Sequence, residues 1–216
     1  MRQNTVTGRR RPRVRPTREE TRSVILTAAE QVFRERGFQP ATVEEIADRA
    51  GFTKGAVYSS FANKDEIFLE LIADRVERRA AYVASIALDA RPGREQARAL
   101  GAALTELMDR EPDWTPMLLE FWIHALRDPQ LRGKLGALRQ RLRRAIAAAF
   151  GPDLSLPPEA AATVVFALAN GLALERLTDP DAVPAQMLPG ILERLLPTDS
   201  GLPKKSTAPR RKDKRS

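Results

Sequence analysis

Apolar residues recur at helical spacing along almost the whole chain from residue 17 to residue 196. Spacings of three, four, seven and eight residues give each segment one apolar face, which predicts amphipathic helices that pack against one another. No segment keeps the alternation of apolar and polar residues that a half-buried strand requires. The pattern therefore predicts an all-α protein.

Capping residues mark four helix starts in the first part of the chain. A Thr or Asn followed three residues later by Glu forms a capping box, and a Thr alone can also act as an N-cap. The predicted helices cover residues 17–36, 42–50, 54–61 and 63–88, and Gly37 and Gly51 are placed to end the first two. The fourth is long enough to join two domains. The four starts are Thr17-Arg18-Glu19-Glu20, Thr42-Val43-Glu44-Glu45, Thr53 and Asn63-Lys64-Asp65-Glu66.

Proline and glycine divide the rest of the chain. Arg91-Pro92-Gly93 breaks the long helix, and helices are predicted over residues 94–110, 115–127, 129–149, 158–177 and 184–196. Most of the prolines fall in loops or in first helical turns, where a missing N–H is tolerated. Pro189-Gly190 lies inside the last predicted helix, so we expect that helix to be kinked or shortened.

The segment from residue 41 to residue 61 has the pattern of a helix-turn-helix. Ala47 is small enough for close helix contact, Gly51 suits a left-handed turn, and Val57 can lock the second helix onto the first. The short second helix then needs no stability of its own, and its outer face can enter a major groove. A small helical bundle with ordinary polar surface residues is the alternative interpretation.

The outward residues of this segment are candidate DNA contacts. Thr42 and Thr53 lie at helix starts that suit phosphate, and Lys54 and Ser59 can reach bases or phosphates. Gly55 and Ala56 permit close approach, with Ala56 placed to meet a thymine methyl group. Tyr58 and Lys64 are expected to contact the DNA backbone. The predicted set is Thr42, Thr53, Lys54, Gly55, Ala56, Tyr58, Ser59 and Lys64.

Charge is unevenly distributed along the chain. The 36 Lys and Arg exceed the 28 Asp and Glu by 8, but residues 1–22 and 204–216 each carry +6 and the remainder carries −4. Such basic ends are typical of nucleic-acid-binding arms and also of solubilising tails. The chain has no Cys and a single His124, which disfavours metal sites and nucleophilic catalysis. We expect no cofactor, no metal site, no catalytic residue and no membrane span.

The segment from about Ser23 to Leu71 resembles the DNA-binding domain of the tetracycline-repressor (TetR/AcrR-like) family of transcription regulators. The resemblance is carried by "TAAEQVFRERGF" and "TVEEIADRAGFTKGAVYSSFANKDEIF". One departure is Ser60, where the family usually has a larger residue that grips the DNA backbone. The resemblance implies a homodimer with an N-terminal three-helix, homeodomain-like helix-turn-helix domain and a C-terminal helical domain for ligand binding and dimerisation.

Two segments of the second domain suit those implied roles. The helix "EAAATVVFALANGLALERL" has an apolar face that could pack against its copy, and a core helix within one subunit is the alternative. An aromatic segment could line an effector pocket, but plain core packing is the favoured explanation of its helical spacing. The candidate dimer residues are Val164, Val165, Leu168 and Leu172. The candidate ligand residues are Trp114, Met117, Phe121, Trp122 and His124.

These observations predict a cytoplasmic, homodimeric, sequence-specific transcriptional regulator. We expect a repressor that an unknown small-molecule effector releases from a double-stranded, pseudo-palindromic DNA operator. The alternative is a basic-tailed architectural or adaptor protein that binds nucleic acid without effector control. The predicted boundaries are a basic arm at 1–16, the DNA-binding domain at 17–63, the ligand-binding and dimerisation domain at 64–197, and a basic tail at 198–216.

Overall fold

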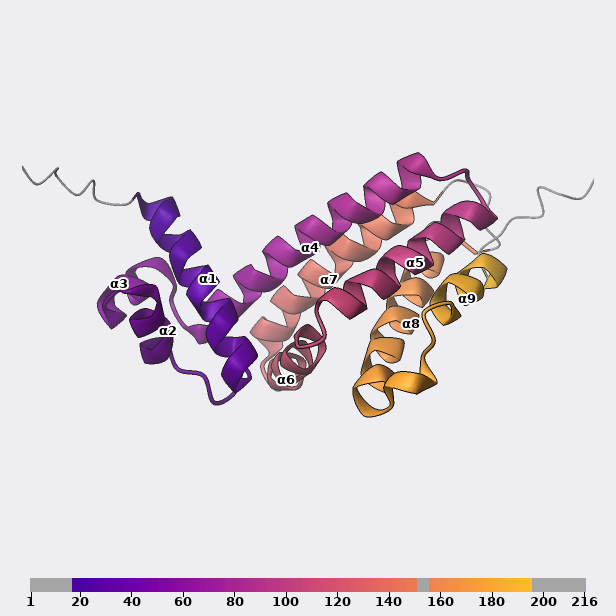
Figure 1. Ribbon diagram of the computed structural model, residues 1–216. Helices are drawn as coiled ribbons and strands as arrows, with labels where there is room; N and C mark the ends of the chain where they lie inside the picture. The colour runs from indigo at the N-terminus through magenta and orange to yellow at the C-terminus, as the bar shows by residue number, and fades with distance from the viewer. Residues whose placement is uncertain (1–16, 151–155, 196–216) are drawn as a thin grey trace, which may run out of the picture. The chain divides into compact units, whose positions relative to one another are not determined.

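The computed structural model describes residues 17–150 and 156–195, and within these ranges every regular element is a helix (Figure 1). The predicted all-α fold is confirmed. The predicted basic arm at 1–16 and basic tail at 198–216 lie outside the described residues. The elements are α1 (Arg18–Arg36), α2 (Val43–Ala50), α3 (Lys54–Ser60), α4 (Lys64–Asp89), α5 (Arg94–Arg110), α6 (Trp114–Leu126), α7 (Pro129–Ala149), α8 (Pro158–Thr178), the 3-10 turn η1 (Pro180–Ala182) and α9 (Met187–Leu195).

The chain divides into two compact units, residues 1–71 and 72–216. The division falls within α4, whose residues up to Leu71 belong to the first unit. The boundary predicted from the sequence, between residues 63 and 64, lies at the start of the same helix.

The first unit holds α1, α2, α3 and the beginning of α4 around an aromatic core. The rings of Phe33, Phe38 and Phe68 lie 4.9 to 5.6 Å apart, and Phe68 meets the other two edge-on. Tilted and edge-on arrangements are the favourable ones for aromatic pairs. Ile46 of α2 and Val57 of α3 are fully buried, so both short helices are held by this core.

The predicted helix starts are present in the first unit. The Thr17 hydroxyl accepts from the backbone N–H of Glu20 at 3.1 Å, and the Glu20 carboxylate accepts from the Thr17 N–H at 2.7 Å. Thr42 and Glu45 make the same reciprocal pair at 3.2 and 3.0 Å. Each pair satisfies two N–H groups that would otherwise have no partner inside the helix.

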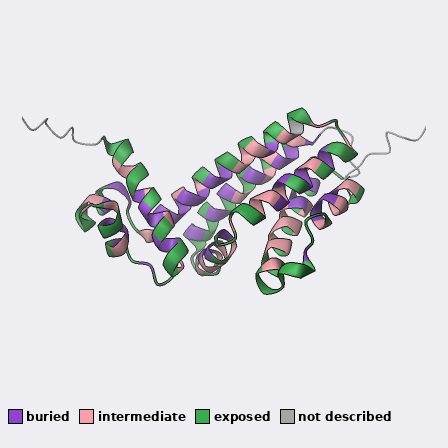
Figure 2. Cartoon of the chain, viewed as in Figure 1, coloured by how far each residue is buried: buried purple, intermediate pink, exposed green. Residues whose placement is uncertain are grey.

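The second unit packs α5 against α9 and α7 against α8, with α6 contacting both α7 and α8. Its helices turn their buried residues toward one another (Figure 2). Phe121, Ile146, Val165 and Leu192 are among the buried side chains of this core.

The last described helix is shorter than its sequence pattern predicts. It begins at Met187 instead of residue 184, and Pro189 falls in its first turn. A proline at that position loses no intrahelical hydrogen bond, so the helix runs on through Gly190 to Leu195. The expected shortening is explained by where the helix begins.

Among the described helices, α8 alone is both long enough and apolar enough to meet the requirements of a membrane span. An 18-residue window of it has a mean hydropathy of 1.4, and 17% of that window is buried within the chain. By length and composition alone it could cross a membrane. The apolar surface of such a helix can equally be covered by other protein surfaces. Its exposed residues include Leu174 and Leu177.

Candidate functional site

Helices α2 and α3 form the helix-turn-helix, and Gly51 makes the turn between them. Gly51 adopts the left-handed conformation, with φ 71° and ψ 27°, that favours glycine. Its N–H and that of Phe52 donate to carbonyls at the end of α2, with Phe52 N to Ala47 O at 2.9 Å. Ala47 and Val57 are buried at the contact between the helices. The seven-residue α3 is therefore held by its neighbours, as predicted.

The outer face of α3 is open to a ligand as large as DNA. Lys54, Gly55, Tyr58 and Ser59 are exposed, and Tyr58 is 46% exposed. A β-carbon at Gly55 would meet only the Thr53 hydroxyl at 3.9 Å, so the backbone is accessible on that side. Ala56 is half-buried. The structure brings most of the predicted DNA contacts together on one short helix.

Lys54 forms an ion pair with Glu44 across the two helices. Its ammonium also lies 5.7 Å from the centre of the Tyr58 ring. The hydrogen bond from Lys54 lowers the pKa of the Glu44 carboxyl, and the same bond raises the pKa of Lys54. Both side chains are more than half exposed, so a phosphate or a base edge can replace Glu44 at little cost.

The hydroxyl groups at the two helix starts have different partners. Thr42 accepts from the Glu45 N–H and also donates to the Glu45 carboxylate at 3.1 Å. Thr53 accepts from the Ala56 N–H at 3.2 Å, which leaves its own O–H proton to donate to a phosphate. Ser59 donates to the Ala56 carbonyl at 2.7 Å. Of these hydroxyls, Thr53 is the one best prepared for a DNA contact.

Lys64 has an unexpected position. Its ammonium donates to the backbone carbonyls of Phe38, Gln39 and Ala41 at 2.8, 2.9 and 2.9 Å, and it lies 4.6 Å from the Phe38 ring centre. Three bonds use all three N–H groups of an ammonium. The phosphate contact stays a prediction, and the geometry gives Lys64 a structural role that its sequence position did not indicate.

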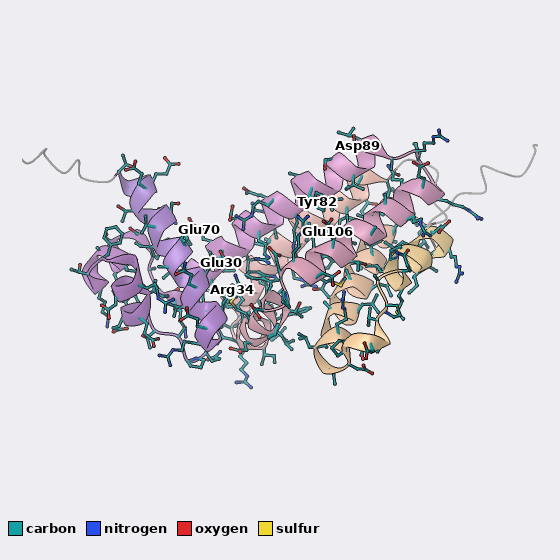
Figure 3. The ribbon with its side chains drawn as sticks, viewed as in Figure 1. Glu30, Arg34, Glu70, Tyr82, Asp89 and Glu106 are labelled. Atoms are coloured by element: carbon teal, nitrogen blue, oxygen red, sulfur yellow. The ribbon has the colours of Figure 1, made fainter. Side chains whose placement is uncertain are left out.

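Arg22 ties three helices of the first unit together, and sequence reasoning missed it. Its guanidinium hydrogen-bonds the Ser60 carbonyl at the end of α3, pairs with Glu70 of α4, and lies 4.2 Å from the Phe61 ring centre. Figure 3 labels Glu70 on α4. Ser60 itself is buried, so the side chain at this position faces the interior and not a DNA backbone.

The second unit contains a cavity of about 70 Å³ with a mainly apolar lining. A second cavity of about 240 Å³ shares Met108, Thr115 and Ala173 with it, so the two adjoin. The first is lined by Arg79, Val83, Leu104, Leu107, Met108, Glu111, Trp114, Thr115, Leu118, Leu142, Ile146, Val165, Phe166, Ala169, Asn170 and Ala173. The second is lined by Met108, Asp109, Pro112, Thr115, Ala173, Arg176, Leu177 and Pro180.

One of the five predicted ligand residues, Trp114, lines this cavity. Met117 and Phe121 are buried. The lining residues of the two cavities include none of Met117, Phe121, Trp122 and His124. Trp122 stacks on the guanidinium of Arg139 at 4.0 Å. The helical spacing of these residues reflects packing on several faces of α6, and only one of those faces borders the cavity.

Arg79 and Asn170 line the cavity and were not predicted. Arg79 lies within the apolar stripe of α4, three residues after Val76 and four before Val83, both of which are buried. A charged residue on the buried face of a helix is a signal that the sequence offered.

On the adjacent surface of α4, the Tyr82 hydroxyl donates to Glu106 of α5 at 2.7 Å, and this bond raises the pKa of Tyr82 (Figure 3).

The predicted dimer residues on α8 do not share one environment. Val164, Leu168 and Leu172 are half-buried within the chain, whereas Val165 is fully buried and lines the cavity. Residues at positions i and i+1 point in different directions on a helix, which explains why Val164 and Val165 differ. Leu174 and Leu177, on other sides of α8, are exposed, and Leu177 also lines the second cavity.

Two family models match the chain, one in each unit. Residues 25–71 match the model described as "Bacterial regulatory proteins, tetR family", and residues 92–198 match "BetI-type transcriptional repressor, C-terminal". Together they cover more than half of the chain. The protein belongs to the tetR family of bacterial regulatory proteins, which confirms the resemblance seen in the helix-turn-helix.

Curated relatives match the chain over part of their length. The HTH-type transcriptional repressor BepR of Brucella suis is 55% identical over 53 residues, which is 24% of this chain and 25% of BepR. The HTH-type transcriptional activator FasR of Mycolicibacterium smegmatis is 30% identical over 103 residues, which is 48% of this chain and 47% of FasR. The chain thus matches between a quarter and a half of these two relatives.

Solved structures share the fold over most of the chain. The transcriptional regulator FadR from Bacillus subtilis in complex with stearoyl-CoA aligns with a TM-score of 0.65 and 15% identity, covering 79% of this chain and 95% of FadR. GusR from Salmonella enterica aligns with a TM-score of 0.65 and 22% identity, covering 82% and 95%. At these identities the similarity establishes the fold.

Proposed function

We propose that this protein is a sequence-specific DNA-binding transcriptional regulator that acts as a homodimer. The observation that carries the proposal is the exposed outer face of α3, where Lys54, Gly55 and Tyr58 lie on a helix that is held entirely by its neighbours. A recognition helix of this kind inserts into the major groove, and a two-fold dimer reads two half-sites one helical turn apart.

A homodimer is supported by the apolar surface of α8. Leu174 and Leu177 are both more than 40% exposed, and little of the apolar window of this helix is covered by its own chain. Large exposed apolar surfaces of soluble proteins are usually covered by a partner. We therefore infer that α8 contributes to the dimer contact, with the half-buried Val164, Leu168 and Leu172 as candidate contact residues.

The cavity of the second unit is the proposed effector site. It is enclosed by α4, α5, α6, α7 and α8, and its lining combines apolar and aromatic side chains with a few polar groups, as ligand pockets do. An effector that favours one arrangement of the dimer shifts the population toward it, and thereby alters operator affinity.

Repression is the proposed mode of action. The model matched by residues 92–198 is described as that of a repressor, and BepR is named a repressor, whereas FasR is named an activator. In this role the protein is cytoplasmic and has no enzymatic activity.

A gel-shift titration tests the proposal. DNA that flanks the coding region is searched for a short inverted repeat, and the full chain is titrated against that duplex and a scrambled duplex of equal length. A basic-tailed adaptor would bind both alike and would lose all binding when residues 1–16 and 204–216 are deleted. The proposed regulator keeps its preference for the inverted repeat after the same deletion.

A further inference from the structure

We propose that the effector is an organic anion, with an apolar body and a carboxylate-type group that pairs with Arg79 and Arg176. This inference rests on the proposed function, because it names the ligand class of the proposed effector site. It is carried by two arginines on different helices that line adjoining cavities and have buried N–H groups to spare.

Arg79 of α4 is only partly neutralised in the first cavity. Its Nη2 donates to the Glu111 carboxylate at 3.2 Å, but the same Glu111 oxygen also forms an ion pair with Arg75. The Nε of Arg79 is buried and has no hydrogen-bond partner. Burial lowers the pKa of Arg79, and Glu111 opposes this less strongly. A second anion would therefore stabilise this guanidinium.

Arg176 of α8 repeats the arrangement in the adjoining cavity. Its Nη2 lies 2.5 Å from the Asp109 carboxylate, while its Nη1 is buried and has no hydrogen-bond partner. An unmet N–H group in a site of low dielectric is costly, so a ligand oxygen that accepts from it gains more than it would on the surface. A guanidinium can also hold a carboxylate with two parallel hydrogen bonds.

The remaining lining selects the body of the ligand. Most of the other side chains that line the first cavity are apolar, including Leu107, Met108, Leu118 and Phe166. The acidic residues that line the cavities, Glu111 and Asp109, are each already paired with an arginine. A cationic ligand would meet two guanidinium groups. A neutral hydroxyl could accept from their N–H groups but would bring no opposite charge, so an anion, whose charge-assisted hydrogen bonds are stronger, is favoured.

Probes that differ only in their head group test the inference. Octanoate, 1-octanol and octylammonium are titrated into the full chain at pH 7 by calorimetry and by the fluorescence of its two tryptophans, Trp114 and Trp122. A second calorimetric series uses 2-naphthoate, 2-naphthol and 2-naphthylmethylammonium. The anion of at least one series should bind about tenfold more tightly than its neutral and cationic counterparts. Arg79→Met and Arg176→Met should each weaken that anion by about tenfold.

Controls separate binding from folding. Arg98→Met removes an exposed arginine that pairs with Glu193 and lines neither cavity, so it should leave anion binding unchanged. Arg79→Met leaves Glu111 paired with Arg75, and Arg176→Met leaves a half-exposed Asp109, so both variants should keep their thermal midpoints near that of the parent. If either fails to fold, Arg79→Lys and Arg176→Lys report instead, and each should retain part of the anion preference.

The inference is overturned if the neutral or cationic probe binds as tightly as the anion, if neither anion binds, or if folded Arg79 and Arg176 variants bind it like the parent. Operator binding without probe is measured in parallel. A chain that binds its operator but shows no anion preference refutes the inference and leaves the regulator. A chain that binds the anion through both arginines but shows no operator preference refutes the regulator and leaves the anion site.

Discussion

Gly101 of α5 lies directly against the backbone of Pro189 in α9. A β-carbon built on Gly101 would lie 2.6 Å from the Pro189 Cα and 2.7 Å from its nitrogen, closer than such atoms ever approach. Only a residue without a side chain allows α5 and α9 to pack at this distance. Pro189 has no N–H to satisfy, so its backbone can sit in this dry contact without losing a hydrogen bond.

Gly101→Ala should therefore destabilise the second unit. Backbone atoms must move to admit the methyl group, and forced overpacking of this kind costs about 1–3 kcal/mol. The free energy of unfolding from urea titration measures the effect. Gly136→Ala in α7 is the matched control: a β-carbon there meets nothing within 4 Å, and alanine should stabilise the helix by about 0.5–1 kcal/mol. Equal effects of the two substitutions would show that the α5 to α9 contact is looser than described.

Substitution of Lys64 should mainly lower stability, whereas substitution of Lys54 should mainly lower operator affinity. Lys64→Met removes three hydrogen bonds to backbone carbonyls and should lower the free energy of unfolding by about 1–3 kcal/mol. Lys54→Met removes only an exposed ion pair with Glu44, so stability should change little while operator affinity and its sequence preference fall. Urea titration and fluorescence anisotropy, carried out on both variants, measure the two effects. A Lys64→Met protein of unchanged stability that has lost salt-dependent DNA binding would instead make Lys64 a phosphate contact.

Arg22→Met should weaken operator binding, although Arg22 belongs to α1 and is not one of the predicted DNA contacts. The substitution removes the link from α1 to the Ser60 carbonyl and to Glu70, so the end of α3 loses its fixed position. Hydrogen exchange of α3 amides should accelerate, and operator affinity should fall without a change in the salt slope. Arg22→Lys keeps the charge without the planar fork and should rescue only part of the loss. A fall in the salt slope by about one would mean that Arg22 touches phosphate.

Acid should destabilise the first unit through three carboxylates. The pKa values of Glu35, Glu44 and Glu45 are lowered, chiefly by hydrogen bonds from Arg49, Lys54 and Thr42 respectively. A lowered folded-state pKa gives stability that is present above the unfolded value, near pH 4.3, and is lost as the pH falls through the folded values. The urea midpoint should therefore decline below about pH 4.3. A Glu35→Gln, Glu44→Gln variant should decline less steeply. Glu95→Gln, which within the described ranges loses a loose 3.9 Å ion pair with Arg91, should follow the parent curve. Parallel curves for all three proteins would contradict the assignment.

The helices and the exposed outer face of α3 could be predicted because the residues that determine them are close together in the sequence. The capping boxes at Thr17 and Thr42, the left-handed Gly51 and the apolar stripe of α4 all act over a few residues. The roles of Lys64 and Arg22 depend on carbonyls and carboxylates more than twenty positions away, so they were not apparent. The lining of the cavity was not apparent from the sequence for a related reason. Spacing on α6 identifies which residues are apolar, but the packing of five helices decides that Trp114 lines the cavity and Phe121 does not.

Helix α3 is proposed to recognise the base sequence of an operator that two copies of the chain share. Fluorescence anisotropy with the full chain, on an inverted repeat and on a scrambled duplex of the same composition at 0.15 M salt, tests it most directly. We predict an affinity ratio of about a thousandfold or more, a stoichiometry of two chains per repeat, and loss of that ratio in Lys54→Met. Equal affinities for both duplexes, with the same steep dependence on salt, would contradict it.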